Sequence, residues 1–152
     1  MNPNAAQTYL RTKVMTATPE QLQLMLYDGA LRFGDQARVA LQAKDYEKSY
    51  TMISNIQKII TEMTSSLKHD IYPELCGKLA ALYTFAYKKL IEANIDHNTE
   101  SLDAALDVLK YQRETWAMLL DQLGKAKAGA AATKINMPAP DARMEASIRL
   151  SA

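Results

Sequence analysis

The sequence predicts an all-α protein: an antiparallel four-helix bundle with an extended N-terminal arm and a flexible C-terminal tail. Apolar residues recur at spacings of three and four along most of the 152-residue chain, which is typical of helices with one buried face. The chain has only five glycines and five prolines, and the prolines stand at or beyond the ends of these periodic stretches. Short polar connections separate four such stretches, and helices joined in this way fold most simply as an antiparallel bundle.

The first 17 residues show no sustained period, so we expect an extended or weakly ordered arm over residues 1–17. The first helix starts in Thr18-Pro19-Glu20-Gln21. There the threonine can cap the helix, the proline suits its first position and the glutamine completes a capping box. This helix should run to about Ala43, a length of roughly 36 Å. Its main apolar face comprises Leu22, Met25, Leu26, Gly29, Phe33, Ala37, Ala40 and Leu41.

The second and third helices also carry start signals. Asp45 can cap the second helix, which should end in the polar stretch at residues 65–70. Pro73 suits the first turn of the third helix. Both helices have one regular apolar face. These faces comprise Tyr46, Tyr50, Ile53, Ile56, Ile60, Met63 and Leu67 in the second helix, and Leu75, Leu79, Leu82, Ala86, Leu90 and Ala93 in the third.

The fourth helix can be capped by Asn98 or Thr99 and terminated by Gly124. The bundle domain is therefore expected over residues 18–124. The composition then shifts to alanine, glycine and lysine, followed by two prolines, which is typical of a linker. We expect residues 125–152 to form a flexible tail, with or without one short helix.

Composition excludes several classes of protein. Lysine and arginine number 18 against 17 aspartates and glutamates, a net charge of +1, whereas nucleic-acid binders and polybasic membrane-surface proteins have a basic excess. No apolar run reaches the ~18 residues of a membrane span, and the N-terminus lacks the layout of a signal peptide. A single cysteine cannot form an internal disulfide, which favours a reducing compartment. We expect a cytoplasmic protein with no nucleic-acid partner and no membrane insertion.

Catalytic, cofactor-binding and metal-binding motifs are missing from the sequence. Neither His69 nor His97 has a glutamate three residues earlier, as a di-iron bundle requires, and no glycine-rich phosphate loop occurs. Cys76 with His69 could form a nucleophile and base, but a small half-buried hydrophobe is the favoured interpretation of Cys76. We therefore expect no enzyme activity, cofactor or metal. Gly29 is interpreted as a point of close helix approach, or else as a tolerated weak spot.

The first helix has a second apolar face. At about 100° per residue, Leu24, Tyr27 and Leu31 lie opposite the main stripe, whereas a surface helix should have only one apolar face. Further apolar residues flank the stripes of the later helices, so that an elongated apolar surface results, too large to be left bare on a monomer. These flanking residues are Met52, Ile59, Tyr83, Tyr87 and Ile91. Three interpretations account for this apolar surface: a thicker core, a homodimer interface or a partner-binding surface.

Several distinctive segments follow one another along the chain. They are Tyr9 to Val14 (Tyr-x-x-x-x-Val), Thr16 to Leu22, Leu24 to Leu31 (Leu-Met-Leu-Tyr-Asp-Gly-Ala-Leu), Asn55 to Glu62, Leu82-Tyr83 with Tyr87, Leu90 to Asn94, and Arg113 to Trp116. In this order they resemble the flagellar secretion chaperone family FliS over about residues 9–118. Together with the helix lengths, their order makes the resemblance specific.

The resemblance implies a helical bundle that binds the disordered C-terminal segment of flagellin in the cytoplasm. It would keep this client unpolymerised and deliver it to the flagellar type III export gate. In the family, the N-terminal arm can cover part of the client surface when no client is bound. By this resemblance, Tyr9 and Leu10 would form a removable plug, with Val14 near its hinge.

The remaining expected partner-binding residues lie on the helices. Leu24, Tyr27 and Leu31 would face the arm or the client, and the surface would continue over Ile59, Tyr83, Tyr87 and Ile91. We expect a monomer or a weak homodimer. The alternatives are a helical-bundle chaperone or adaptor for another client, and a structural homodimer without flagellin binding.

The tail departs from the family pattern. Met144 and Ile148 form a short apolar pair on a tether, so residues 137–150 could dock on the bundle in place of a client helix. A disordered tail is the favoured alternative.

Overall fold

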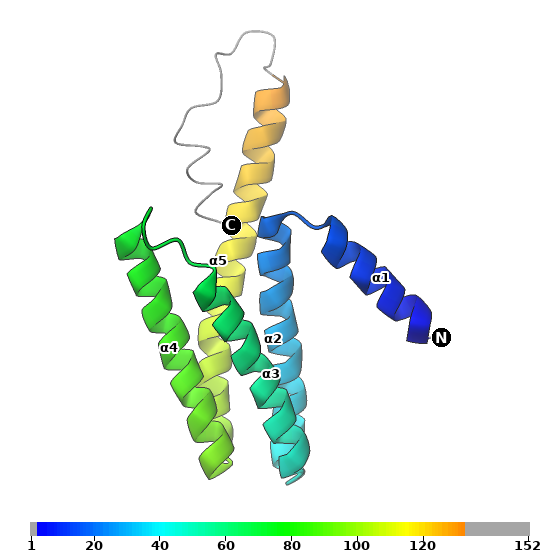
Figure 1. The fold of residues 1–152 in the computed structure, drawn as a ribbon, viewed down its shortest axis with the longest axis vertical. Coiled ribbons are helices and arrows are strands. Elements are labelled where there is room, and N and C mark those ends of the chain that lie inside the picture. The colour runs from blue at the N-terminus through cyan, green and yellow to red at the C-terminus, as the bar shows by residue number, and fades with distance from the viewer. Residues whose placement is uncertain (1–2, 133–152) are drawn as a thin grey trace.

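The computed structural model describes residues 3–132, and over this range the chain forms five helices and no strand (Figure 1). The helices are α1 (Pro3–Thr16), α2 (Pro19–Gln42), α3 (Tyr46–Ser65), α4 (Pro73–Asp96) and α5 (Thr99–Ala132). Helices α2 to α5 form the predicted bundle, in which α2 and α4 each pack against both α3 and α5. The all-α bundle is therefore confirmed. The α3–α4 contact is the least extensive of the four.

Local capping sets the helix starts, as predicted. The Thr18 Oγ1 accepts a hydrogen bond from the Gln21 backbone N–H (3.1 Å), and the Gln21 side chain accepts one from the Thr18 N–H (3.0 Å). The Asp45 carboxylate accepts a bond from the Lys48 N–H at 3.2 Å. Asn98, rather than Thr99, caps α5 because its Oδ1 accepts the first free N–H groups of that helix.

Two expected irregular segments are helical instead. The arm forms α1, because its alanine, glutamine, lysine and arginine residues favour a helix locally even without a regular apolar face. Helix α5 passes through Gly124 and ends at Ala132. The alanines after Gly124 have the highest helix propensity and offset the ~1 kcal/mol that one glycine costs. The predicted segment around Met144 and Ile148 lies outside the described residues.

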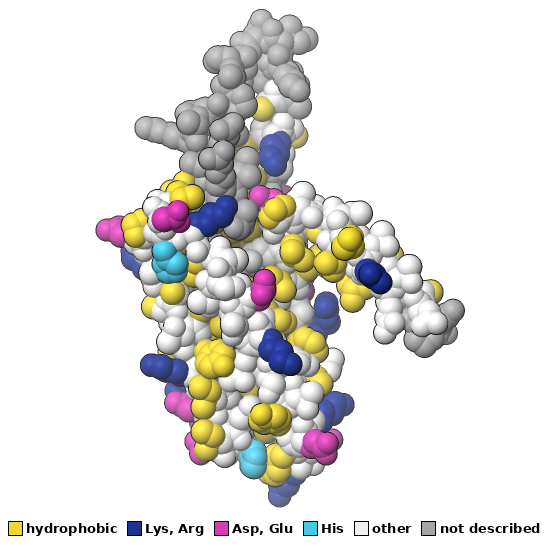
Figure 2. Space-filling model, viewed as in Figure 1, with side chains coloured by type: hydrophobic (Ala, Val, Ile, Leu, Met, Phe, Trp, Pro, Cys, Tyr) yellow, Lys and Arg dark blue, Asp and Glu magenta, His cyan; other side chains and the backbone are white. Residues whose placement is uncertain are grey.

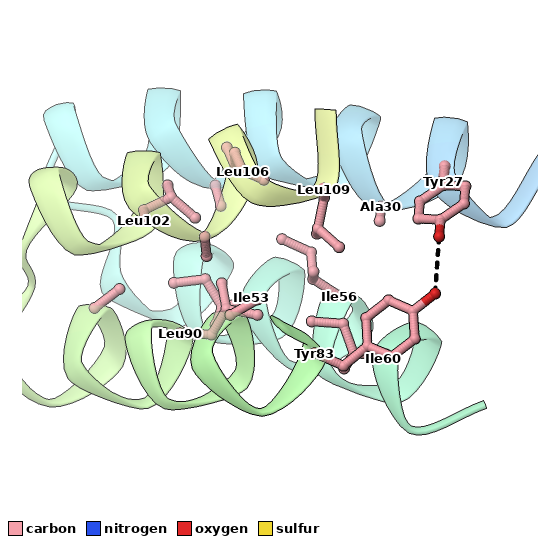
Figure 3. Close-up of a cluster of buried hydrophobic side chains, with 14 of the residues drawn as sticks. Tyr27, Ala30, Ile53, Ile56, Ile60, Tyr83, Leu90, Leu102, Leu106 and Leu109 are labelled. Carbon is pink, nitrogen blue, oxygen red and sulfur yellow. Dashed lines mark hydrogen bonds between the residues drawn. The ribbon is translucent and has the colours of Figure 1, made fainter. Parts of the chain in front are cut away.

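The bundle core is made mainly of aliphatic side chains from all four helices, together with Tyr27 and Tyr83 (Figure 3). Helix α2 contributes mainly small residues, with Ala30 and Ala37 fully buried, while α3, α4 and α5 contribute larger ones. The buried face of α2 also includes Tyr27, which is only 4% exposed, whereas Leu22 on the predicted main face is 37% exposed. Of the interpretations left open for the second apolar face of α2, a thicker core therefore accounts for Tyr27, whose hydroxyl meets that of Tyr83 on α4.

The glycine at which α2 meets another helix closely is Gly34, not Gly29. A Cβ atom added at Gly34 would lie within 3.0 Å of three side-chain atoms of Leu106, which is itself buried in α5. At Gly29, the nearest atom to such a Cβ is Ile59 Cδ1 at 3.7 Å, an ordinary van der Waals distance. Gly34 therefore permits the α2–α5 approach, and Gly29 is the tolerated weak spot.

The substitutions Gly29→Ala and Gly34→Ala separate these two roles. Both gain helix propensity, by up to about 1 kcal/mol, but only Gly34→Ala overpacks the α2–α5 contact. Relative to Gly29→Ala, Gly34→Ala should lower the free energy of unfolding by about 1–3 kcal/mol, measured by urea denaturation. Equal stabilities of the two variants would contradict this assignment.

Candidate functional site

Polar contacts fix α2 against α5 at the end of the bundle where α2 begins. The Arg113 Nε donates to the Asp28 carboxylate at 2.8 Å, and the Trp116 Nε1 donates to the Glu20 backbone carbonyl at 2.9 Å. These bonds bring the sequence segment around Asp28 together with the segment from Arg113 to Trp116. Both ion-pair partners are more than one-third exposed, so their main contribution is to orientation rather than to stability.

A second polar contact links α2 to α4 across the core. The hydroxyl oxygens of Tyr27 and Tyr83 lie 2.8 Å apart and share a hydrogen bond (Figure 3). Burial raises the pKa of both tyrosines above the usual value, so both hydroxyls stay protonated near neutral pH. They therefore present neutral donor and acceptor groups at the bottom of the space above them.

That space is an open pocket of about 200 Å³ between the start of α2, the α3–α4 connection and the middle of α5. Its walls are mainly apolar, and its floor carries the two tyrosine hydroxyls. The lining residues are Gln23, Tyr27, Met63, Ser66, Leu67, Lys68, Cys76, Leu79, Leu82, Tyr83, Tyr111, Gln112, Thr115, Trp116 and Leu119. Cys76 is 2% exposed, so it is a small hydrophobe that is fully buried and not half-buried as predicted.

A groove runs from this pocket between α3 and α4. Its α4 side presents Tyr83, Tyr87 and Ile91, which are four residues apart and so lie on one face of the helix. Its α3 side is formed by Ile60 and by the polar residues Thr61, Thr64 and Ser65. Tyr83, which is 1% exposed, is the residue that lines both the pocket and the groove. The pocket and the groove together are hereafter called the apolar track.

Four of the residues expected to bind a partner meet on the apolar track. Tyr27 and Tyr83 are buried beneath it, while Tyr87 and Ile91 are 36% and 39% exposed along the groove. The other six residues line neither the pocket nor the groove. They are Tyr9, Leu10, Val14, Leu24, Leu31 and Ile59.

These six residues lie away from the pocket and the groove for different reasons. Ile59 points toward α2, where its Cδ1 approaches Gly29, and Leu31 packs against the core; both are partly buried, as is Leu24. Tyr9, Leu10 and Val14 lie on α1, which projects from the bundle with these side chains exposed (Figures 1 and 2). Figure 2 also shows hydrophobic side chains gathered on α1 close to the point where it joins the bundle.

Sequence reasoning missed other residues of the pocket, above all Gln112. A signal was present: Gln112 lies three residues after Leu109 and four before Trp116, on the core-facing stripe of α5. A polar residue on such a stripe is unusual, since buried polar groups need partners. Trp116, expected mainly in the core, both packs against the core and lines the pocket.

The described residues contain no group of three or more His, Cys, Asp or Glu side chains able to hold a metal ion. Both histidines are exposed, and His97 stacks on Tyr46 with ring centroids 3.6 Å apart at the opposite end of the bundle. None of the five described helices is long and apolar enough to cross a bilayer.

Comparison with known proteins agrees with this geometry. The family model "Flagellar protein FliS" matches residues 1–123. The chain is 33% identical to the flagellar secretion chaperone FliS of Bacillus subtilis over 128 residues, 84% of this chain and 93% of the relative. It is 29% identical to the FliS chaperone of Campylobacter jejuni over 115 residues, 76% and 90% of the two chains.

A third relative, the flagellar secretion chaperone FliS of Salmonella typhimurium, is 27% identical over 115 residues, 75% of this chain and 85% of that one. The matched range contains α1, the whole pocket and the groove. These relatives are chaperones and not enzymes, in agreement with the prediction that the chain has no enzyme activity. The chain therefore belongs to the FliS family, and its role is that of a chaperone in flagellar export.

Proposed function

We propose that this protein binds the disordered C-terminal segment of flagellin in the cytoplasm, prevents its premature polymerisation and delivers it to the flagellar type III export gate. The observation that carries the proposal is the apolar track of a chain that belongs to a family of flagellar secretion chaperones. The client segment would lie along this track, and the bundle itself needs no covalent chemistry.

The track suits an amphipathic helix. Tyr87 and Ile91 are partly exposed and stand four residues apart, one and two turns after the buried Tyr83. An incoming helix with its own anchors at such spacings can pack against them. From Leu79 in the pocket to Ile91 in the groove, α4 extends about 18 Å, which accommodates roughly three turns of a client helix. Tyr87, which is 36% exposed, suits this surface because its ring can bury apolar area while its hydroxyl stays hydrated.

Folding of the client on the track would keep the affinity moderate. Coupled folding can bury on the order of 1,000–3,000 Å², but ordering the segment costs several kcal/mol of the interaction energy. A complex of this kind covers the apolar surface through which flagellin segments assemble and still releases its cargo. That combination is what an export chaperone requires.

The double substitution Tyr87→Asp, Ile91→Asp tests the groove. Both side chains are partly exposed, so the bundle should still fold, unlike with a substitution at buried Tyr27. Loss of two apolar anchors and the burial of two charges should weaken binding of a synthetic flagellin C-terminal segment about 100-fold or more in calorimetric titration. The matched control is Ile95→Asp, on the same helix and 71% exposed but outside the groove, which should bind as the unmodified protein does.

Undiminished binding by the double variant would refute the groove as the client site. A dimer of the unmodified protein that persists in the presence of the flagellin segment would favour a structural homodimer instead. The account predicts a monomer or weak dimer that forms a 1:1 complex with the segment.

We also propose that α1 covers part of the track when no client is bound. Residues Ala17 and Thr18 connect α1 to α2. This connection lies at the pocket end of the bundle, because Gln23, near the start of α2, lines the pocket. Fourteen helical residues extend about 21 Å, enough to reach the pocket from this hinge. Rotation there would bring Tyr9, Leu10 and Val14 toward the apolar walls.

Deletion of residues 1–16 tests this competition. A short tether supplies an effective concentration on the order of 1 mM, so even docking with a Kd of about 0.1 mM lowers the apparent client affinity roughly tenfold. The truncated protein should therefore bind the flagellin segment about tenfold more tightly in the same titration. An unchanged or weaker affinity would show that α1 does not compete with the client.

A further inference from the structure

Gln112 is a buried polar side chain without a partner. It is 7% exposed, and neither its Nε2 nor its Oε1 makes a hydrogen bond to the part of the chain that the structure describes. It lies on α5 between Leu109, which is fully buried, and Trp116. Buried side-chain amides are normally hydrogen-bonded, because burial of an unpaired donor and acceptor is destabilising. An exception at this position calls for a functional reason.

The surroundings of Gln112 show what kind of group could satisfy it. It lines the pocket beside Tyr27 and Tyr83, whose hydroxyls already bond to each other. The walls include Leu79 and Leu119, and Lys68 is the one charged residue among those that line the pocket. The pocket thus has apolar walls and an uncharged polar floor.

The side-chain amide of Gln112 determines which hydrogen-bonding group can pair with it. Gln112 offers N–H donors and a carbonyl acceptor side by side, so a matching occupant must provide an acceptor and a donor together. A carboxylate would leave the Gln112 Oε1 unpaired, and an ammonium group would leave its Nε2 unpaired. An apolar side chain would bury both without partners. A hydroxyl both donates and accepts, but through one oxygen atom, whereas a primary amide from asparagine or glutamine presents a donor and an acceptor side by side and satisfies both atoms.

We propose that this pocket is a subsite for one asparagine or glutamine side chain of the bound client, and that Gln112 is the residue that selects it. This inference rests on the proposed function, because the client is taken to be the flagellin C-terminal segment. A pocket of about 200 Å³ has room for one such side chain. A site built for a hydrogen-bonding group discriminates strongly against analogues that lack it. The subsite thereby adds selectivity to a track that is otherwise apolar.

The substitution Gln112→Met separates selectivity from stability. Methionine has nearly the same length but lacks both the donor and the acceptor. The melting temperature of the free protein should rise by about 3 °C, since an unpaired buried amide is removed, while affinity for the flagellin segment should fall about tenfold. Gln122→Met, at an exposed position of the same helix outside the pocket, is the matched control and should change neither quantity appreciably.

A second measurement varies the client and needs no variant of the chaperone. Each asparagine and glutamine of the flagellin segment is changed singly to leucine and titrated against the unmodified protein. One of these changes should weaken binding about tenfold, and the same change should have no further effect on binding to Gln112→Met. Such coupling identifies the amide that occupies the pocket.

Two results would overturn this inference while leaving the proposed function intact. One is equal affinity of the Gln112→Met variant and the unmodified protein for the flagellin segment. The other is the finding that no single change of an asparagine or glutamine of the segment to leucine weakens its binding. Failure of the unmodified protein to bind the segment at all would instead refute the proposed function, and the inference with it.

Discussion

The close approach of α2 to α5 is the constraint on which the rest of this structure depends. Ala30, Gly34 and Ala37 give α2 a face of small residues, and Leu106 of α5 occupies the space that a side chain at Gly34 would need. Polar bonds at both ends of the contact fix its register: Arg113 to Asp28 at one end and Arg38 to Asp103, at 2.6 Å, at the other. The small residues let the backbones of α2 and α5 approach closely, and the two ion pairs fix the position of one helix along the other.

The groove lies on the opposite side of the bundle from this contact. Helices α3 and α4 contact each other less extensively than the other neighbours do, and the groove with Tyr87 and Ile91 runs between them. Tyr83 of α4 lines both the pocket and this groove, and its hydroxyl is hydrogen-bonded to that of Tyr27. Helices α2 and α5 are thus held together by close packing and ion pairs, and the groove lies between the other two helices.

Local signals in the sequence predicted the helices well. Thr18, Asp45 and Asn98 cap helices through bonds between neighbouring residues, so their effect is readable without the fold. The apolar periods likewise predicted the bundle. The same local reasoning missed α1 and the continuation of α5 through Gly124, because the absence of an apolar face or the presence of one glycine does not prevent helix formation.

Features that depend on the neighbouring helix could not be predicted in this way. A helical wheel shows that α2 has two apolar faces but not which helices cover them. It therefore leaves open what covers Tyr27, and it does not separate close approach from a tolerated weak spot at Gly29. The importance of Gly34 depends on Leu106, 72 positions later in the chain, and the unpaired state of Gln112 depends on four helices at once. The resemblance to the FliS family supplied the function, which the apolar periods alone left open.

Trp116 offers the most direct test of the claim that the client binds at this end of the bundle. It is the single tryptophan of the chain, it is partly buried, and it lines the pocket. Addition of a tryptophan-free flagellin C-terminal segment should shift its fluorescence emission to shorter wavelength and saturate at one segment per chain, because the client excludes water from the indole ring. Calorimetric binding of the segment without any change in this emission would contradict the account.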